Sequence, residues 1–184
     1  TMVGGTPWAR FFGSCGGPRQ YYSTMKLTLY LMAGSALLFP GLITLYFQSG
    51  AETWNILEIA RAGGLSRELQ SVLSPCIYAG VGVLAGRFPF HGWAPAGDVA
   101  APTDVSMLHA GVLMKLGAFG ILRIGMTCLP EGAAYWAPTF AALATAGIVY
   151  GAFVAMRQTD FKYVIGFSSV SHMGIVLLGL NTMT

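Results

Sequence analysis

Charged residues are scarce in this sequence. Aspartate, glutamate, lysine and arginine together make up 9% of its 184 residues, whereas a typical soluble domain carries about 25%. Hydrophobic residues make up 54%, and the mean hydropathy is +0.61. A soluble globular domain is therefore excluded, and the composition predicts an integral membrane protein.

Several classes of functional site are also missing. The three cysteines, Cys15, Cys76 and Cys128, are odd in number and far apart, so the sequence encodes neither a disulfide framework nor a zinc site, and we interpret them as structural thiols. The net charge of +3 is small and dispersed, which argues against nucleic-acid binding. No phosphate loop, dinucleotide fingerprint or Ser/His/Asp set is present. We therefore expect no cofactor or metal in this chain.

Apolar segments recur along the whole chain. We predict an all-α integral membrane protein with about five transmembrane helices, forming one membrane domain over residues 1–184, because each segment is about as long as a bilayer-spanning helix requires. One segment is short and runs into Pro89, which ends or breaks a helix. The predicted spans lie near residues 27–47, 72–90 (broken), 103–126, 136–156 and 163–180.

The break lies in the most informative stretch, FPFHGWAPAGDVAAPTDVSMLHAGVLMK, which runs from Phe88 to Lys115. We predict that Phe88–Pro95 is irregular backbone at membrane depth, which is tolerated only where protein or a hydrated cavity covers it. Broken helices of this kind recur at ion-handling sites of transporters. The break is therefore the predicted centre of the functional region.

Lys115 lies deep in the helix that follows. It is ten residues beyond Val105, or about 15 Å at 1.5 Å per residue, which places it near the middle of a bilayer. An ionisable side chain at that depth is costly and by default functional. Desolvation favours the neutral amine and a nearby negative charge favours the ammonium, so a moving counter-charge can load and release a proton. The alternative is permanent pairing with a carboxylate as a packing device.

Three runs resemble one known family. FPFHGWAPAGDVAAPTDVSMLHAGVLMKLGAFGILR and GAFVAMRQTDFKYVIGFSSVSHMG resemble the signatures of antiporter-like proton-translocating subunits of respiratory complex I, the NADH:quinone oxidoreductase, and of their cation/proton antiporter relatives. GGPRQYYSTMKLTLYLMAGS, residues 16–35, resembles the M-type member, called subunit 4 in mitochondria. The resemblance implies part of an antiporter-like helix bundle. It also implies that the chain is the middle portion of such a subunit, truncated at both ends, which should not pump protons in isolation.

The resemblance implies a function and a setting. It implies proton translocation by a membrane-arm subunit, coupled to quinone reduction in partner subunits that hold NADH, FMN, iron–sulfur clusters and quinone. Expected partners are other membrane-arm subunits, including further antiporter-like ones, and the lipid bilayer. The expected location is an energy-coupling membrane, with the bacterial plasma membrane favoured over the mitochondrial inner membrane. The alternatives are a subunit of a cation/proton antiporter or membrane-bound hydrogenase, and a shortened, non-pumping structural subunit.

The resemblance also assigns residues in and after the break. Lys115 matches the central lysine of the family. His109 occupies a position where M-type members often have an aliphatic residue and L-type members a histidine. A neutral imidazole there can both donate and accept, as a proton relay requires, or it can be satisfied by a neighbouring hydroxyl or carbonyl. On an ideal helix the two side chains lie about 120° apart, so they share a face only if the helix is distorted.

Other candidates lie before the break and in the last span. His91 matches the family histidine, as a proton carrier or as a partner for backbone groups freed by the break. Many members carry a lysine seven residues earlier, where this chain has Leu84. Arg87 could replace that lysine or act as a fixed charge that tunes Lys115, although a guanidinium keeps its proton. His172, near several serines, could line a hydrated path or bond between helices.

Overall fold

The structure is a computed structural model that describes residues 20–50, 55–62 and 65–182, and all regular elements in these ranges are helices. The prediction of an all-α membrane fold is thereby confirmed. Cys15 and the first part of the 16–35 run lie outside the described residues, whereas Cys76 and Cys128 are free thiols. Four helices are long and apolar enough to cross a membrane: Gln20–Ser49, Thr103–Met126, Pro130–Met156 and Phe161–Asn181.

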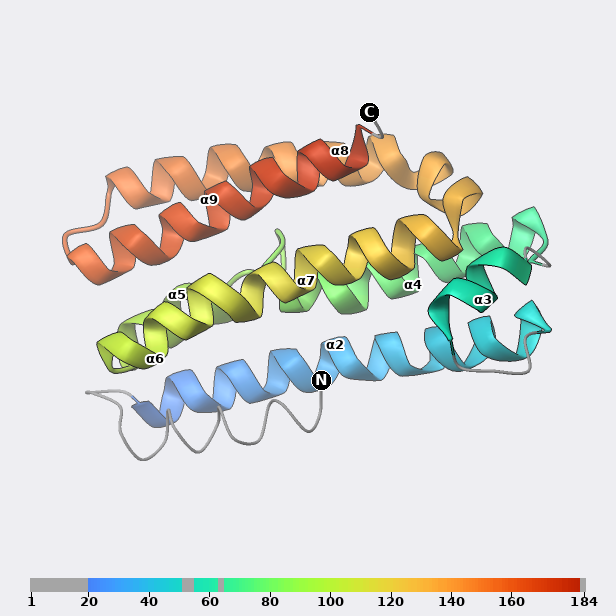
Figure 1. Ribbon diagram of the computed structural model, residues 1–184. Helices are drawn as coiled ribbons and strands as arrows, with labels where there is room; N and C mark the ends of the chain where they lie inside the picture. The colour runs from blue at the N-terminus through green and yellow to red at the C-terminus, as the bar shows by residue number, and fades with distance from the viewer. Residues whose placement is uncertain (1–19, 51–54, 63–64, 183–184) are drawn as a thin grey trace.

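Helix α4, Arg67–Leu84, lies at the centre of the bundle. It packs against α2 (Gln20–Ser49), against the helix that follows the break, and against α8 (Pro130–Met156). The approach to α2 is closest where two glycines meet: a Cβ built on Gly80 would lie 2.8 Å from the carbonyl oxygen of Gly34. Small residues that let helix backbones touch are a common packing device in membranes. The short α3, Ile56–Ala62, lies near the end of α2 (Figure 1).

The helix break follows α4. The chain turns at Gly86, which has a φ of +67°, a conformation that glycine adopts at no steric cost. Helical structure resumes at α5, Trp93–Ala100, so the irregular backbone ends before Pro95, the end of the predicted irregular segment. The indole Nε1 of Trp93 donates to the carbonyl of Val83 at 2.9 Å. This bond satisfies one of the carbonyls that the end of a helix leaves without an intrahelical partner.

The span after the break is a continuous rod, Thr103–Met126, that is not uniformly α-helical. Figure 1 shows it lying between α2 and the last two helices. Two of its segments have π-helical hydrogen bonding, which is rare and frequently occurs at functional sites. From its start the rod comprises α6 (Thr103–Leu108), η1 (His109–Leu113), α7 (Met114–Gly120) and η2 (Ile121–Met126).

The last two helices, α8 and α9 (Phe161–Asn181), form an antiparallel hairpin joined by a short connection (Figure 1). A Cβ built on Gly174 would lie 2.7 Å from a side-chain carbon of Ile148, and one on Gly151 would lie 3.0 Å from the backbone nitrogen of Ser171. The Ser171 hydroxyl donates to the Ile148 carbonyl across the interface at 3.1 Å. Glycines and a hydroxyl thus hold this pair together, as in other membrane helices.

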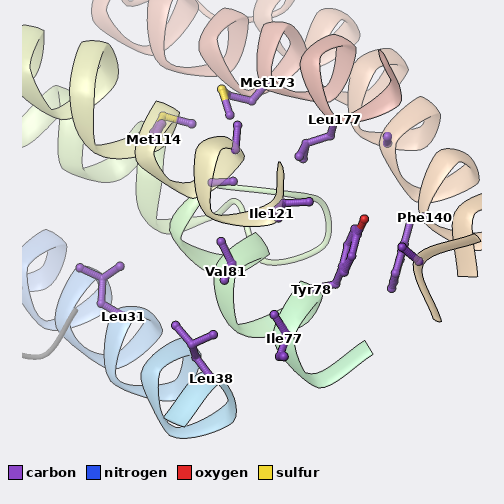
Figure 2. Packing of buried hydrophobic residues seen from close by; sticks show 14 of the residues in the cluster. Leu31, Leu38, Ile77, Tyr78, Val81, Met114, Ile121, Phe140, Met173 and Leu177 are labelled. Atoms are coloured by element: carbon purple, nitrogen blue, oxygen red, sulfur yellow. The ribbon is translucent and has the colours of Figure 1, made fainter. Parts of the chain in front are cut away.

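The buried apolar residues form one cluster that joins all of these helices. Figure 2 shows Val81 on α4 between Leu38 on α2 and Ile121 in the rod, with Leu177 on α9 above. Many large apolar side chains nevertheless stay exposed, Phe39 at 59% and Phe153 at 63% among them. Side chains of this kind on long apolar helices suit contact with lipid or with other membrane helices.

Candidate functional site

A buried acid and a buried base meet beside the break. The Asp98 carboxylate, on α5, lies 2.6 Å from Nδ1 of His109, the first residue of η1. His109 has no exposed surface, and Asp98 is 3% exposed. The connection at Ala101 and Pro102 brings the two together, since its backbone is extended and folds the rod back onto α5. At 2.6 Å the contact is slightly shorter than the usual range of about 2.7–2.9 Å for a charge-assisted N–H···O bond.

The pair has polar and aromatic neighbours. The Ser106 hydroxyl donates to Oδ1 of Asp98 at 3.4 Å, and the Trp93 ring meets the imidazole edge-on, with centroids 5.1 Å apart. Oδ2 of Asp98 is buried and has no hydrogen-bond partner among the described residues. Buried polar atoms of this kind are usually satisfied by ordered water. The site is therefore able to bind water or a proton at this carboxylate.

The π segment lies between His109 and Lys115. In an α-helix the N–H of Met114 would reach the carbonyl of Ala110, but here it donates to the carbonyl of His109. The Lys115 ammonium donates to the Ala110 carbonyl instead, at 2.6 Å. The distortion that would be needed for a shared face is therefore present. Even so, Lys115 is exposed and His109 is buried against α5, so the two side chains remain on different faces of the rod.

Arg87 lies in the irregular segment and faces α8. It is 6% exposed, and its guanidinium carbon lies 4.8 Å from the centroid of the Phe140 ring. Tyr78 stacks on the same ring at 4.4 Å. Two guanidinium nitrogens, Nε and Nη1, are buried without a hydrogen-bond partner in the described part of the chain. Arg87 is thus a buried cation that contacts α4 and α8.

His91 lies in an aromatic enclosure. It is 8% exposed, and its ring lies 5.6 Å from that of Phe88, 5.0 Å from that of Tyr150 on α8 and 6.4 Å from that of Phe167 on α9. Its Nδ1 is buried with no hydrogen-bond partner among the residues described. One carbonyl freed by the break is bonded by Trp93, as described above. His91 itself also makes a hydrogen bond with the backbone of Pro89, within the break.

His172 lies apart from these residues. It is exposed on α9, and its Nδ1 lies 2.8 Å from the carbonyl of Ser168 and 3.3 Å from the Ser168 hydroxyl, both on its own helix. The bond between helices that the sequence suggested for His172 and its neighbouring serines is made by Ser171. Leu84, at the position where the resemblance leads one to expect lysine, packs against the apolar cluster.

The structure brings together one pair that the sequence analysis did not connect. His109 was a candidate, but Asp98 was not singled out. An indication was available, because Asp98 is an acidic residue amid alanines and glycine in the apolar stretch after the break, and acids at membrane depth are usually functional. Its partner was not predictable, because the contact depends on how α5 folds back against the rod.

Comparison with known proteins gives a consistent result. The family model described as NADH:quinone oxidoreductase/Mrp antiporter, TM, matches residues 12–184. NAD(P)H-quinone oxidoreductase chain 4 2 of Microcystis aeruginosa is 37% identical over 174 residues, which cover 92% of this chain and 31% of that protein. This chain therefore spans about a third of the length of that relative.

Two solved structures share the fold. A chain in respiratory complex I from Thermus thermophilus with bound NADH superposes with a TM-score of 0.90 at 24% identity, over 98% of this chain and 38% of that one. A chain in the Mrp complex from Dietzia sp. superposes with a TM-score of 0.81 at 18% identity, over 95% of this chain and 33% of that one. The break and the π-helical rod thus lie within a fold that is found in both kinds of assembly.

Proposed function

Because the chain belongs to the NADH:quinone oxidoreductase/Mrp antiporter membrane family, we propose that it is the proton-conducting middle portion of a membrane-arm subunit of NADH:quinone oxidoreductase. The subunit lies in an energy-coupling membrane, with the bacterial plasma membrane favoured, beside other membrane-arm subunits. NADH, FMN, iron–sulfur clusters and quinone belong to partner subunits. Their oxidoreduction drives the proton movement, and this chain supplies no redox centre.

Lys115 is the observation that carries the proposal. Its ammonium lies in the middle third of the rod and is held by a backbone carbonyl, and no carboxylate among the described residues forms an ion pair with it. A cation at membrane depth without a fixed counter-ion responds strongly to any charge that approaches it. That property suits a group that takes up and releases protons in turn. It does not suit a packing device that is locked to a permanent partner.

The remaining candidates take graded roles. His109 relays protons through water towards Lys115, and His91 lies at the break, where its enclosed ring can exchange protons with water. Arg87 acts as a fixed charge because its guanidinium keeps its proton. His172 contributes least, since it is bonded within its own helix. Leu84 leaves the end of α4 without a titratable group.

Two alternative functions make different predictions. A cation/proton antiporter subunit, which the fold shared with the Mrp complex favours, would show sodium-dependent proton movement without NADH or quinone. A shortened structural subunit would retain the helices for assembly only. Deleting it would lower the yield of the complex, whereas changing Lys115 would have no effect.

The test is a pair of substitutions at Lys115 in the assembled complex, reconstituted in vesicles. Lys115→Met removes the charge, and Lys115→Arg keeps the charge but cannot release a proton at neutral pH. We expect both variants to assemble and both to lose most NADH-driven proton uptake, measured with a pH-sensitive dye. Proton uptake at the wild-type rate in Lys115→Met would refute the proposal. Uptake restored by arginine alone would show that Lys115 is a fixed charge and not a carrier.

A further inference from the structure

We infer that Asp98 and His109 form one buried proton-binding unit that serves as the switchable counter-charge of Lys115. This inference rests on the proposed function and adds a residue, Asp98, to it. The unit consists of the Asp98 carboxylate and the His109 imidazole, joined at 2.6 Å and shielded from solvent. We refer to these two side chains as the acid–base pair.

The pair has two charge states that differ by one proton. With a neutral imidazole and an ionised carboxylate, its net charge is −1. With one more proton, held by the imidazole or shared along the short bond, the net charge is zero.

Because the pair is buried, a change in its net charge acts strongly on nearby charged groups. A negative charge that is 3% exposed is screened much less than a surface charge. Asp104, the next acid along the chain, is exposed in the first turn of the rod. Asp98 is therefore the buried carboxylate of the segment that leads from the break to Lys115.

The spacing defines the transfer step. His109 and Lys115 are six residues apart, or about 9 Å along the helix axis, and their side chains lie on different faces of the rod. Direct transfer between them is therefore excluded, and water is the required carrier. The Lys115 ammonium gives up one N–H proton to water, and a water on the other side gives one to the pair. Lys115 becomes a neutral amine, the pair goes from −1 to zero, and the water is unchanged.

Two observations support the pair as an exchanging unit. Oδ2 of Asp98 is buried without a hydrogen-bond partner in the described ranges, so the carboxylate can accept from water in addition to His109. The rod is π-helical from His109 to Leu113, and the diverted bond of Met114 leaves the Ala110 carbonyl to Lys115. The backbone segment that begins at His109 therefore also holds the Lys115 ammonium. The same segment can therefore respond to the protonation of either group.

The experiment uses variants of the assembled, vesicle-reconstituted complex. Asp98→Asn keeps the shape of the side chain and removes its charge. Asp98→Leu/His109→Leu replaces the pair by apolar residues, a change that buried ion pairs often tolerate without loss of stability. Asp104→Asn is the matched control, since it makes the same change at an acid that is exposed in the first turn of the rod. Proton uptake per NADH and the amount of assembled complex are measured for each.

If the pair exchanges protons, both Asp98→Asn and the double variant assemble and lose at least tenfold in proton uptake, while Asp104→Asn stays within twofold of wild type. The infrared difference spectrum on NADH addition should also show a change in the carboxylate bands that is absent in Asp98→Asn. A double variant that assembles and pumps normally would overturn the inference, because it would show a packing role. Failure of both variants to assemble would overturn it for the same reason.

The outcome at Lys115 separates this inference from the proposed function. Loss of uptake in Lys115→Met together with normal uptake in Asp98→Asn would refute the acid–base pair alone. Normal uptake in Lys115→Met would refute the proposed function itself.

Discussion

The α8–α9 hairpin and the segment from α4 through the rod differ in backbone regularity and in how their polar groups are satisfied. In the hairpin the helices are regular, glycines bring the backbones together, and Ser169, Ser171 and His172 bond to backbone carbonyls on their own or the facing helix. One buried polar atom of the hairpin, Oδ1 of Asn181, lacks a partner among the described residues. In the other segment the helix is broken, two stretches are π-helical, and Asp98, His91 and Arg87 carry buried polar atoms without described partners.

The difference shows where the protein tolerates energetic cost. Irregular backbone and unpaired polar groups are expensive in a membrane, and local structural compromises of this kind are expected at functional sites. We therefore expect changes in the hairpin to affect assembly and changes near the break to affect both assembly and proton movement. Three substitutions test this comparison, from the largest expected effect to the smallest.

Gly174→Leu should have the largest effect. A Cβ at Gly174 would already lie 2.7 Å from Ile148 and 3.1 Å from the Ala144 carbonyl, so the larger side chain must push α8 and α9 apart, at a cost of about 3 kcal/mol or more for a severe overpacking. The amount of assembled complex should fall sharply, as measured by native gel electrophoresis. The molecules that do assemble should pump normally. Reduced pumping in a fully assembled variant would show that the hairpin affects proton movement as well as assembly, which contradicts the comparison.

Trp93→Phe should have an intermediate effect. The change keeps an aromatic ring in the core but removes one of two donors to the Val83 carbonyl, which keeps the Gly86 N–H at 3.1 Å. The loss of one hydrogen bond should cost about 1 kcal/mol. Both thermal stability of the complex and proton uptake per NADH should decrease. Trp136→Phe is the matched control, since Trp136 donates in the same way to the carbonyl of Ser71, from α8. An equal loss of uptake in the control would show that stability alone explains the result.

His172→Gln should have the smallest effect. The imidazole is exposed and bonded within α9, and surface substitutions of this kind usually change stability by less than about 0.5 kcal/mol. Proton uptake and assembly should both stay within about twofold of wild type. A large loss of uptake with intact assembly would place His172 on the proton path and extend the functional region into the hairpin.

The sequence predicts the architecture well because membrane spans depend on local composition. The all-α fold, the long apolar helices and the break near Pro89 follow from the length of apolar runs and from proline and glycine. The partners of the polar residues do not follow in this way. The bond from Trp93 to the Val83 carbonyl, for example, is set by the turn at Gly86.

The candidate site was predicted only in part for the same reason. Lys115 and His109 stand out because charged and titratable residues are rare in apolar helices. The pairing of His109 with Asp98 depends on the fold of the connection between α5 and the rod. The π segments depend on which carbonyl each backbone N–H bonds to. The α-helical and π-helical alternatives differ by single hydrogen bonds, and the amino-acid composition does not indicate which of them forms. The burial of Arg87 against Phe140 likewise arises from packing between distant segments.

The π-helical rod also bears on how this site can evolve. Each residue added to a helix turns everything beyond it by about 100° while lengthening it by only about 1.5 Å. A π segment absorbs such an extra residue without disturbing either end. Deleting one residue from His109–Leu113 would therefore restore α-helical hydrogen bonding there, while Lys115 and the preceding break kept their positions. Single-codon insertions and deletions in this segment are changes that a lineage could tolerate without redirecting the charge of Lys115.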